Sequence, residues 1–125
     1  MHNLTKIALG FAVAGSLGLG GVARAEKDVT FSGDVMPVIQ EKCAECHKPD
    51  GDGTKASGLD MSTYDALMKG TKFGAVIVPG EPDRSSLLIL IDGRAKIRMP
   101  HDRKRLDAKE IRLFRRWIRQ GAKNN

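Results

Sequence analysis

The sequence predicts a small all-α domain of four or five short helices. Apolar residues recur at helical spacing in several segments, and loops that contain Gly and Pro separate those segments. Removal of the first 25 residues would leave 125 − 25 = 100 residues, which is enough for one small domain. Its few aromatic residues would form only a thin apolar core, and small domains of this kind often depend on a metal, a disulfide or a cofactor.

The first 25 residues have the pattern of a secretory signal peptide. Lys6 precedes an apolar stretch over residues 7–23 that is rich in Gly and Ala, and alanines flank Arg24 at its end. The stretch is shorter than the ~20 residues of a spanning helix, although an uncleaved membrane anchor is the alternative interpretation. We expect cleavage after Ala25, export to the periplasm, and a single domain at residues 26–125 without a membrane span.

The first helix of the domain is predicted from Asp34, as the N-cap, to about Glu45. Pro37 would lie in its first turn, where the missing N–H is harmless. At helical spacing one arc of this helix carries Val35, Met36, Ile39, Cys43, Cys46 and His47. The following residues 48–58 are rich in Gly and Asp and predict a loop.

Three further helices and one loop complete the layout. A short helix is predicted from Ser62 to a stop at Gly70, and another from about Asp83 to Ile91. Residues 94–105 show neither a helical nor a strand period and predict a loop. The last helix has Asp107 at its N-cap, a capping-box partner at Glu110 and a stop at Gly121. Its apolar half includes the aromatic residues Phe114 and Trp117, which we expect in the core. The residues of its opposite face are basic: Lys109, Arg112, Arg115, Arg116 and Arg119.

Both cysteines belong to the sequence "CAECH", residues 43–47. A thioredoxin-like pair would need a strand before the first cysteine, a structural zinc site would need four ligands, and a local disulfide would leave His47 unexplained. In an exported chain, C-x-x-C-H is typical of c-type haem attachment. Cys43 and Cys46 would then form thioethers to one haem c, and His47 would reach the iron from one side.

A second axial ligand has to come from elsewhere in the chain. Met36 lies on the attachment helix, and Met61 and Met68 are interpreted as flexible core residues. Met99 lies in a loop, precedes Pro100 and follows His47 by 99 − 47 = 52 residues, so we favour it as the distal ligand. His101 is the rival, and it would give a lower reduction potential because Met/His ligation raises that potential.

Several blocks together resemble the planctomycete-type cytochrome c domain among the monohaem class I cytochromes c: "FSGDVMPVIQEKCAECH", "VIVPGEPDRSSLL", "RMPH" and "EIRLFRRWIRQGA". They span nearly all of residues 26–125. The resemblance implies an all-helical cytochrome c-like fold in which the first and last helices cross around one covalently bound haem c. It also implies thioethers at Cys43 and Cys46, with His47 and Met99 as axial ligands. His101 stands where relatives often have a second proline, which leaves a His-ligated or ligand-switching state open.

The charge distribution indicates a partner. Residues 94–125 contain 12 Lys/Arg and 3 acidic residues, a balance of +9, whereas residues 26–93 contain 7 and 12, a balance of −5. We expect acidic redox proteins, and not nucleic acid, to dock on a basic surface. That surface consists of Arg94, Lys96, Arg98, Arg103, Lys104, Arg105, Arg112, Arg115, Arg116 and Arg119.

With both axial positions filled, the site suits one-electron transfer. We therefore expect a periplasmic electron carrier, not an enzyme, that shuttles electrons between larger redox proteins. Multihaem cytochromes of a respiratory, extracellular electron-transfer or metal-oxidation chain are candidate partners. The alternative is a haem enzyme or small-ligand sensor whose distal position is labile or vacant.

Overall fold

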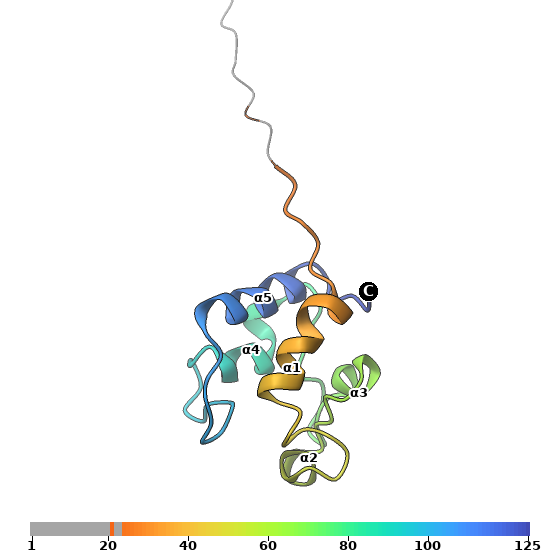
Figure 1. The fold of residues 1–125 in the computed structure, drawn as a ribbon, viewed down its shortest axis with the longest axis vertical. Helices are drawn as coiled ribbons and strands as arrows, with labels where there is room; N and C mark the ends of the chain where they lie inside the picture. The colour runs from red at the N-terminus through yellow and green to blue at the C-terminus, as the bar shows by residue number, and fades with distance from the viewer. Residues whose placement is uncertain (1–20, 22–23) are drawn as a thin grey trace, which may run out of the picture.

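The computed structural model describes residue 21 and residues 24–125, so the predicted signal peptide lies almost wholly outside the described residues. The described part is all-helical and contains no named strand, which confirms the predicted fold class. In chain order its elements are η1 (Phe31–Val35), α1 (Met36–Lys42), α2 (Asp52–Ser57), α3 (Tyr64–Lys69), η2 (Pro82–Arg84), α4 (Ser86–Ile91) and α5 (Ala108–Arg119). Figure 1 shows α5 packed beside the start of the α1 segment, with α2 at the far end of the molecule.

The two ends of the domain are joined at an aromatic cluster. The ring centroids of Phe31 and Trp117 lie 5.5 Å apart, and Tyr64 stands edge-on to Phe31 at 5.2 Å. The hydroxyl of Tyr64 donates to the carbonyl oxygen of Ala122 at 2.8 Å, and the amide of Phe31 donates to Oδ1 of Asn125 at 2.9 Å. Such edge-on and offset aromatic contacts add to the energy of area burial. The first and last helical segments are therefore held against each other.

The first helix differs from its predicted bounds at both ends. It begins earlier, with the single π-helical turn η1, and Asp34 lies inside that turn instead of at the N-cap. The Asp34 carboxylate accepts from the amide and hydroxyl of Thr30, and these hydrogen bonds hold the pKa of Asp34 below its usual value. Helix α1 ends at Lys42 because the backbone of Cys43 leaves helical geometry, with φ −123°. The predicted arc therefore does not extend as a helix to Cys46 and His47.

A second correction concerns residues 48–58, which were predicted to be a loop but contain α2 (Asp52–Ser57). The amide of Thr54 donates to the carbonyl oxygen of Cys46 at 3.0 Å, and Gly58 ends the helix in the left-handed region at φ 81°. A helix this short has little stability of its own. Contacts with the cysteine segment stabilise it, and those contacts have no local signal in the sequence.

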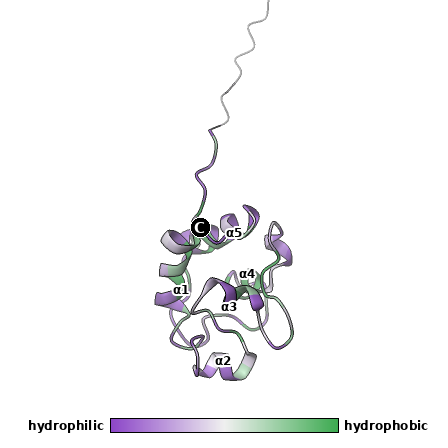
Figure 2. Ribbon diagram, turned by 90° about the vertical axis from the view of Figure 1, so that its right-hand side faces the viewer, coloured by the Kyte–Doolittle hydropathy of each residue, from purple (hydrophilic) through white to green (hydrophobic). Residues whose placement is uncertain are grey.

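The remaining elements agree more closely with expectation. Helix α3 begins after Thr63 and ends at Gly70, as predicted to within two residues. The helix predicted from Asp83 is divided into η2 and α4 at Ser85, a fully buried residue whose hydroxyl oxygen accepts from the amide of Val78 at 2.9 Å. Figure 2 shows the hydrophobic character of α4, whose residues Leu87, Leu88 and Ile91 are buried.

Helix α5 confirms the predicted capping box. The Asp107 side chain accepts from the amide of Glu110, and the Glu110 side chain accepts from the amide of Asp107, each at 2.8 Å. Phe114 and Trp117 are buried as expected, and residues 94–105 form the predicted loop without regular structure. Among the described residues, no helix has the length and apolar character needed to cross a membrane.

Candidate functional site

One cavity of about 400 Å³ lies between the cysteine segment, α2, α4 and the loop of residues 94–105. Its volume falls within the ~300–1,000 Å³ of small-molecule and cofactor sites. Most of the wall is made of apolar side chains, supplied by Leu59, Met61, Val76, Leu87, Leu90, Ile91, Leu106 and Phe114. The site therefore suits a ligand with a large apolar surface.

Cys43, Cys46 and His47 line this cavity together. They follow the end of α1 in a turn in which the amides of Cys46 and His47 both donate to the carbonyl oxygen of Cys43, at 3.2 and 3.0 Å. Both cysteines are half-buried free thiols. Burial raises the pKa of the Cys43 thiol to about 11, because an apolar environment disfavours the thiolate, and the negative charge of Glu110 adds to the effect.

The imidazole of His47 is oriented by the backbone of the neighbouring loop. Its Nδ1 lies 3.0 Å from the carbonyl oxygen of Leu59, which also accepts from the hydroxyl of Thr54 at 2.8 Å. A carbonyl oxygen can only accept, so Nδ1 carries the proton in this arrangement. In the neutral imidazole this leaves the lone pair on Nε2, which is the arrangement that a metal-ligating histidine requires.

Helix α2 approaches the cysteine segment so closely that side chains are excluded at two positions. A Cβ added at Gly51 would lie 2.4 Å from the carbonyl oxygen of Cys46. One added at Gly53 would lie 2.8 Å from Cε1 of His47 and 3.0 Å from Nε2. The two glycines thus allow the helix backbone to lie against the imidazole, and the sequence pattern alone did not indicate this role for them.

Replacement of Gly53 by alanine is expected to destabilise the protein, although alanine usually stabilises a helix relative to glycine by ~0.5–1 kcal/mol. The added Cβ would push against the imidazole or the carbonyl of Cys46, and overpacking of this kind costs about 1–3 kcal/mol. Thermal unfolding of the purified protein measures the effect. Lys55→Ala, at an exposed position of the same helix, is the control and should change stability little. An unchanged or higher Tm for Gly53→Ala would contradict the packing described here.

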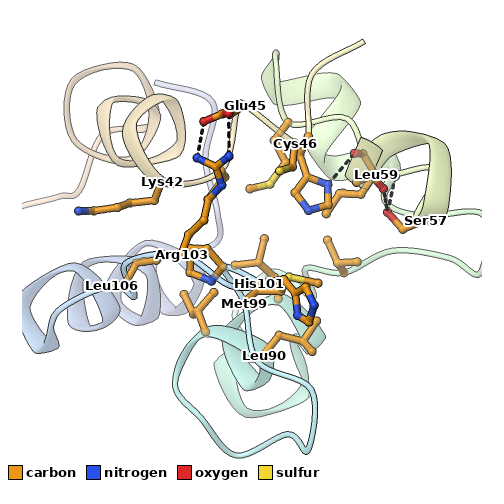
Figure 3. A pocket seen from close by; sticks show the side chains of 18 of the residues that line it. Lys42, Glu45, Cys46, Ser57, Leu59, Leu90, Met99, His101, Arg103 and Leu106 are labelled. Atoms are coloured by element: carbon orange, nitrogen blue, oxygen red, sulfur yellow. Dashed lines mark hydrogen bonds and ion pairs between the residues drawn. The ribbon is translucent and has the colours of Figure 1, made fainter. Parts of the chain in front are cut away.

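Met99 reaches the same cavity from the loop of residues 94–105. Its amide donates to the carbonyl oxygen of Leu90 at 3.1 Å, and its half-buried side chain packs against the core. Figure 3 shows Cys46 and Met99 on opposite sides of the cavity. The rival residue His101 also borders the cavity, but its side chain is 70% exposed and its Nε2 lies 3.2 Å from the carboxylate of Asp102.

Met61 lines the cavity, although its sequence pattern predicted only a role in core packing. Its side chain is 3% exposed, and it borders the cavity as well as belonging to the core. Its amide donates to the carbonyl oxygen of His47 at 2.7 Å, so its backbone is tied to the segment that carries the imidazole. Met36 and Met68 pack against the core and do not line the cavity.

The basic residues expected to form a docking surface fall into two groups. Four of them make ion pairs with the protein's own carboxylates, which reduces the charge that they present to a partner: Arg94 and Arg115 with Asp83 and Asp92, Arg103 with Glu45, and Arg116 with Glu26. The other six are exposed and make no ion pair within the described part of the chain: Lys96, Arg98, Lys104, Arg105, Arg112 and Arg119. The positive surface is therefore smaller than the sequence suggested, and its largest share lies on the loop that carries Met99.

The residues in this cavity fit a covalently attached haem. Two thiols and an imidazole with an available nitrogen lie on one wall, a thioether reaches the cavity from the other side, and apolar side chains form most of the remaining wall. Thiolate or thioether sulfur and imidazole nitrogen are the donor types used to hold haem iron and its porphyrin.

Residues 43–102 match the family model described as Planctomycete cytochrome C. The matched range begins at the first cysteine and ends just beyond Met99, so it contains every predicted ligand. No curated protein and no solved structure matches the chain.

Proposed function

Because residues 43–102 of this chain are a domain of the planctomycete cytochrome c family, whose members bind haem and transfer electrons, we propose that it is a one-electron carrier. It carries one haem c in thioether linkage to Cys43 and Cys46, with His47 and Met99 as the axial ligands. The observation that supports this proposal most strongly is the meeting of these four side chains at one apolar cavity.

The environment of His47 supports its role as proximal ligand. The hydrogen bond from Nδ1 to the carbonyl oxygen of Leu59 fixes the tautomer and the ring orientation, and it makes Nε2 a stronger ligand for a metal ion. The hydroxyl of Thr54, in α2, donates a hydrogen bond to the same carbonyl oxygen. The chain thus presents the imidazole in one orientation and needs little rearrangement to coordinate iron.

The position of Met99 favours it over His101 as distal ligand. The Met99 side chain is half-buried against the core, whereas the His101 side chain is mostly exposed and already contacts Asp102. Movement of His101 to the iron would require that contact to break and the loop to shift. Met99 therefore needs the smaller change, and its ligation would give the higher reduction potential.

When bound, the haem supplies a one-electron couple between ferric and ferrous iron. The chain's own contribution is to fill both axial positions and to surround the group with apolar residues, including Leu59, Leu90 and Phe114. This surrounding limits access of water, and occupied axial positions leave no site for oxygen or peroxide. Such an arrangement suits electron transfer and not catalysis of a substrate reaction.

The same proposal includes the location and partner of the protein. Residues 1–25 direct export and are removed, so the domain acts in the periplasm. An acidic redox protein docks on the exposed cations Lys96, Arg98, Lys104 and Arg105, which surround Met99 in sequence. The partner would then lie against the loop that carries Met99, and salt would slow the association.

Carbon monoxide binding to the reduced protein tests this function. We expect slow binding at neutral pH, because the Met99 sulfur must first leave the iron. A haem enzyme or small-ligand sensor with a vacant position would bind the gas rapidly. Rapid binding by the wild-type protein would therefore replace the electron-carrier proposal with a ligand-binding one.

A further inference from the structure

Residues 100–105, the part of the loop that follows Met99, make very few polar contacts with the rest of the described domain. No backbone hydrogen bond of these six residues reaches another element in the region that the structure describes. The ion pair of His101 is with its neighbour Asp102, and no ion pair of Lys104 or Arg105 is observed among the described residues. The polar contact that joins this segment to the domain is the ion pair between Arg103 and Glu45.

This ion pair connects two segments that are 58 positions apart in the sequence. Glu45 lies between the two cysteines of the attachment motif, and Arg103 follows Met99 by four positions. The pair is bidentate: Nη2 of Arg103 donates to Oε1 of Glu45 at 2.7 Å, and Nη1 donates to Oε2. Figure 3 shows the Arg103 side chain extending from the Met99 side of the cavity to Glu45 beside Cys46. Both residues line the cavity.

The loop is better secured at its two ends. On the N-terminal side, the amides of Ala95 and Met99 donate to the carbonyl oxygens of Ile89 and Leu90, at 3.2 and 3.1 Å. On the C-terminal side, Leu106 is 6% exposed and lies in the core. Any local opening of the loop would therefore occur between Met99 and Leu106, and Arg103 lies in the middle of that interval.

We infer that the Arg103–Glu45 ion pair is a latch that holds the Met99 loop closed over the cavity and sets how often the Met99 sulfur leaves the iron. The inference rests on the proposed ligation by Met99. Arg103 and Glu45 are then positioning residues, because they act on the iron only through the loop. The latch joins the distal ligand to the segment that carries both attachment cysteines.

The latch should respond to ionic strength. The Arg103 side chain is 49% exposed and the Glu45 side chain is 68% exposed, so salt screens their attraction. Exposed ion pairs stabilise weakly, and loss of this one should raise the population of the open loop about two- to fivefold. That change is too small to unfold the protein, but a rate limited by loop opening would report it directly.

The test is the rate of carbon monoxide binding to the reduced, haem-loaded protein. Glu45→Gln and Arg103→Gln should each raise the rate about two- to fivefold, and the double variant should raise it no further. Added salt should raise the rate of the wild type and leave that of the variants almost unchanged. Lys104→Gln removes the same charge from the neighbouring residue without breaking the pair, so it is the matched control for this measurement and should bind carbon monoxide at the wild-type rate.

Amide hydrogen exchange gives a second measurement, independent of ligand binding. Exchange of the Met99 amide, which donates to the carbonyl oxygen of Leu90, should accelerate in Glu45→Gln and Arg103→Gln, but not in Lys104→Gln. Unchanged rates in the two latch variants, additive effects in the double variant, or an equal effect of Lys104→Gln would each overturn the latch. If the wild type lacks the sulfur-to-iron absorption band, the proposed ligation by Met99 fails and the latch fails with it. A normal band with unchanged rates would overturn the latch alone.

Discussion

Replacement of both Cys43 and Cys46 by alanine is expected to give a protein that carries no covalent haem and does not keep its fold. The cavity of about 400 Å³ would lack its contents. Its apolar wall would then face water instead of the porphyrin, and each apolar side chain left exposed forgoes about 1.5–3 kcal/mol of burial. Several such losses together are large beside the ~5–15 kcal/mol by which a native protein is stable. Haem staining after denaturing electrophoresis and far-ultraviolet circular dichroism measure the two effects.

Single replacements serve as controls for this experiment. Cys43→Ala and Cys46→Ala each leave one thioether site, so each should retain some covalent haem and part of the helical signal. Covalent haem in the double variant would show that the attachment residues are wrongly assigned. A fully helical, haem-free double variant would show that the apolar wall packs without the cofactor.

The second large effect is expected for Met99→Ala. Loss of the thioether ligand should abolish the weak near-red absorption band of sulfur-ligated ferric haem. The reduction potential should fall by on the order of 0.1 V or more, which is a modest part of the ~0.8 V that axial ligation spans. The reduced variant should also bind carbon monoxide rapidly, because the position held by Met99 is open. Optical spectroscopy and potentiometry measure these changes on one sample.

Two other variants test whether another residue that lines the cavity, and not Met99, is the distal ligand. His101→Ala should keep the band and nearly the same potential, since that side chain is mostly exposed. Met61→Leu tests the buried methionine of the cavity wall and should also keep the band. A band that survives in Met99→Ala but disappears in either of the other two would transfer the distal role to that residue.

The parts of the fold that were predictable are those with local signals. Helix α5 combines a capping box at Asp107 and Glu110 with a long amphipathic pattern, and its position was predicted closely. Helix α3 lies between Thr63 and Gly70, which are typical start and stop residues. In both cases, the side chains that determine the helix boundaries lie within the helix or beside it in sequence.

The helix boundaries were predicted wrongly where contacts between segments distant in the sequence decide the structure. Helix α2 contains Gly53, which usually disfavours a helix interior, yet it forms because its backbone packs against Cys46 and His47. Helix α1 stops at Lys42, before the predicted end, and the chain then turns to present the cysteines to the cavity. Ser85 divides η2 from α4 through hydrogen bonds to residues 78 and 81, which helical periodicity does not reveal.

The candidate site was predictable in its reactive groups but not in their support. The spacing of Cys43, Cys46 and His47 indicated haem attachment, and the loop position of Met99 favoured it as the distal residue. The carbonyl oxygen of Leu59, which orients the imidazole, belongs to the backbone and has no residue signature. The close approach at Gly53 and the Arg103–Glu45 pair likewise depend on tertiary geometry.

The most direct measurement is a spectroelectrochemical titration of the purified, exported wild-type protein. We expect one reversible one-electron transition, with six-coordinate low-spin spectra in both states and the sulfur-to-iron band in the ferric state. Absence of a haem spectrum, more than one transition, or a high-spin ferrous state would contradict a single haem held by His47 and Met99.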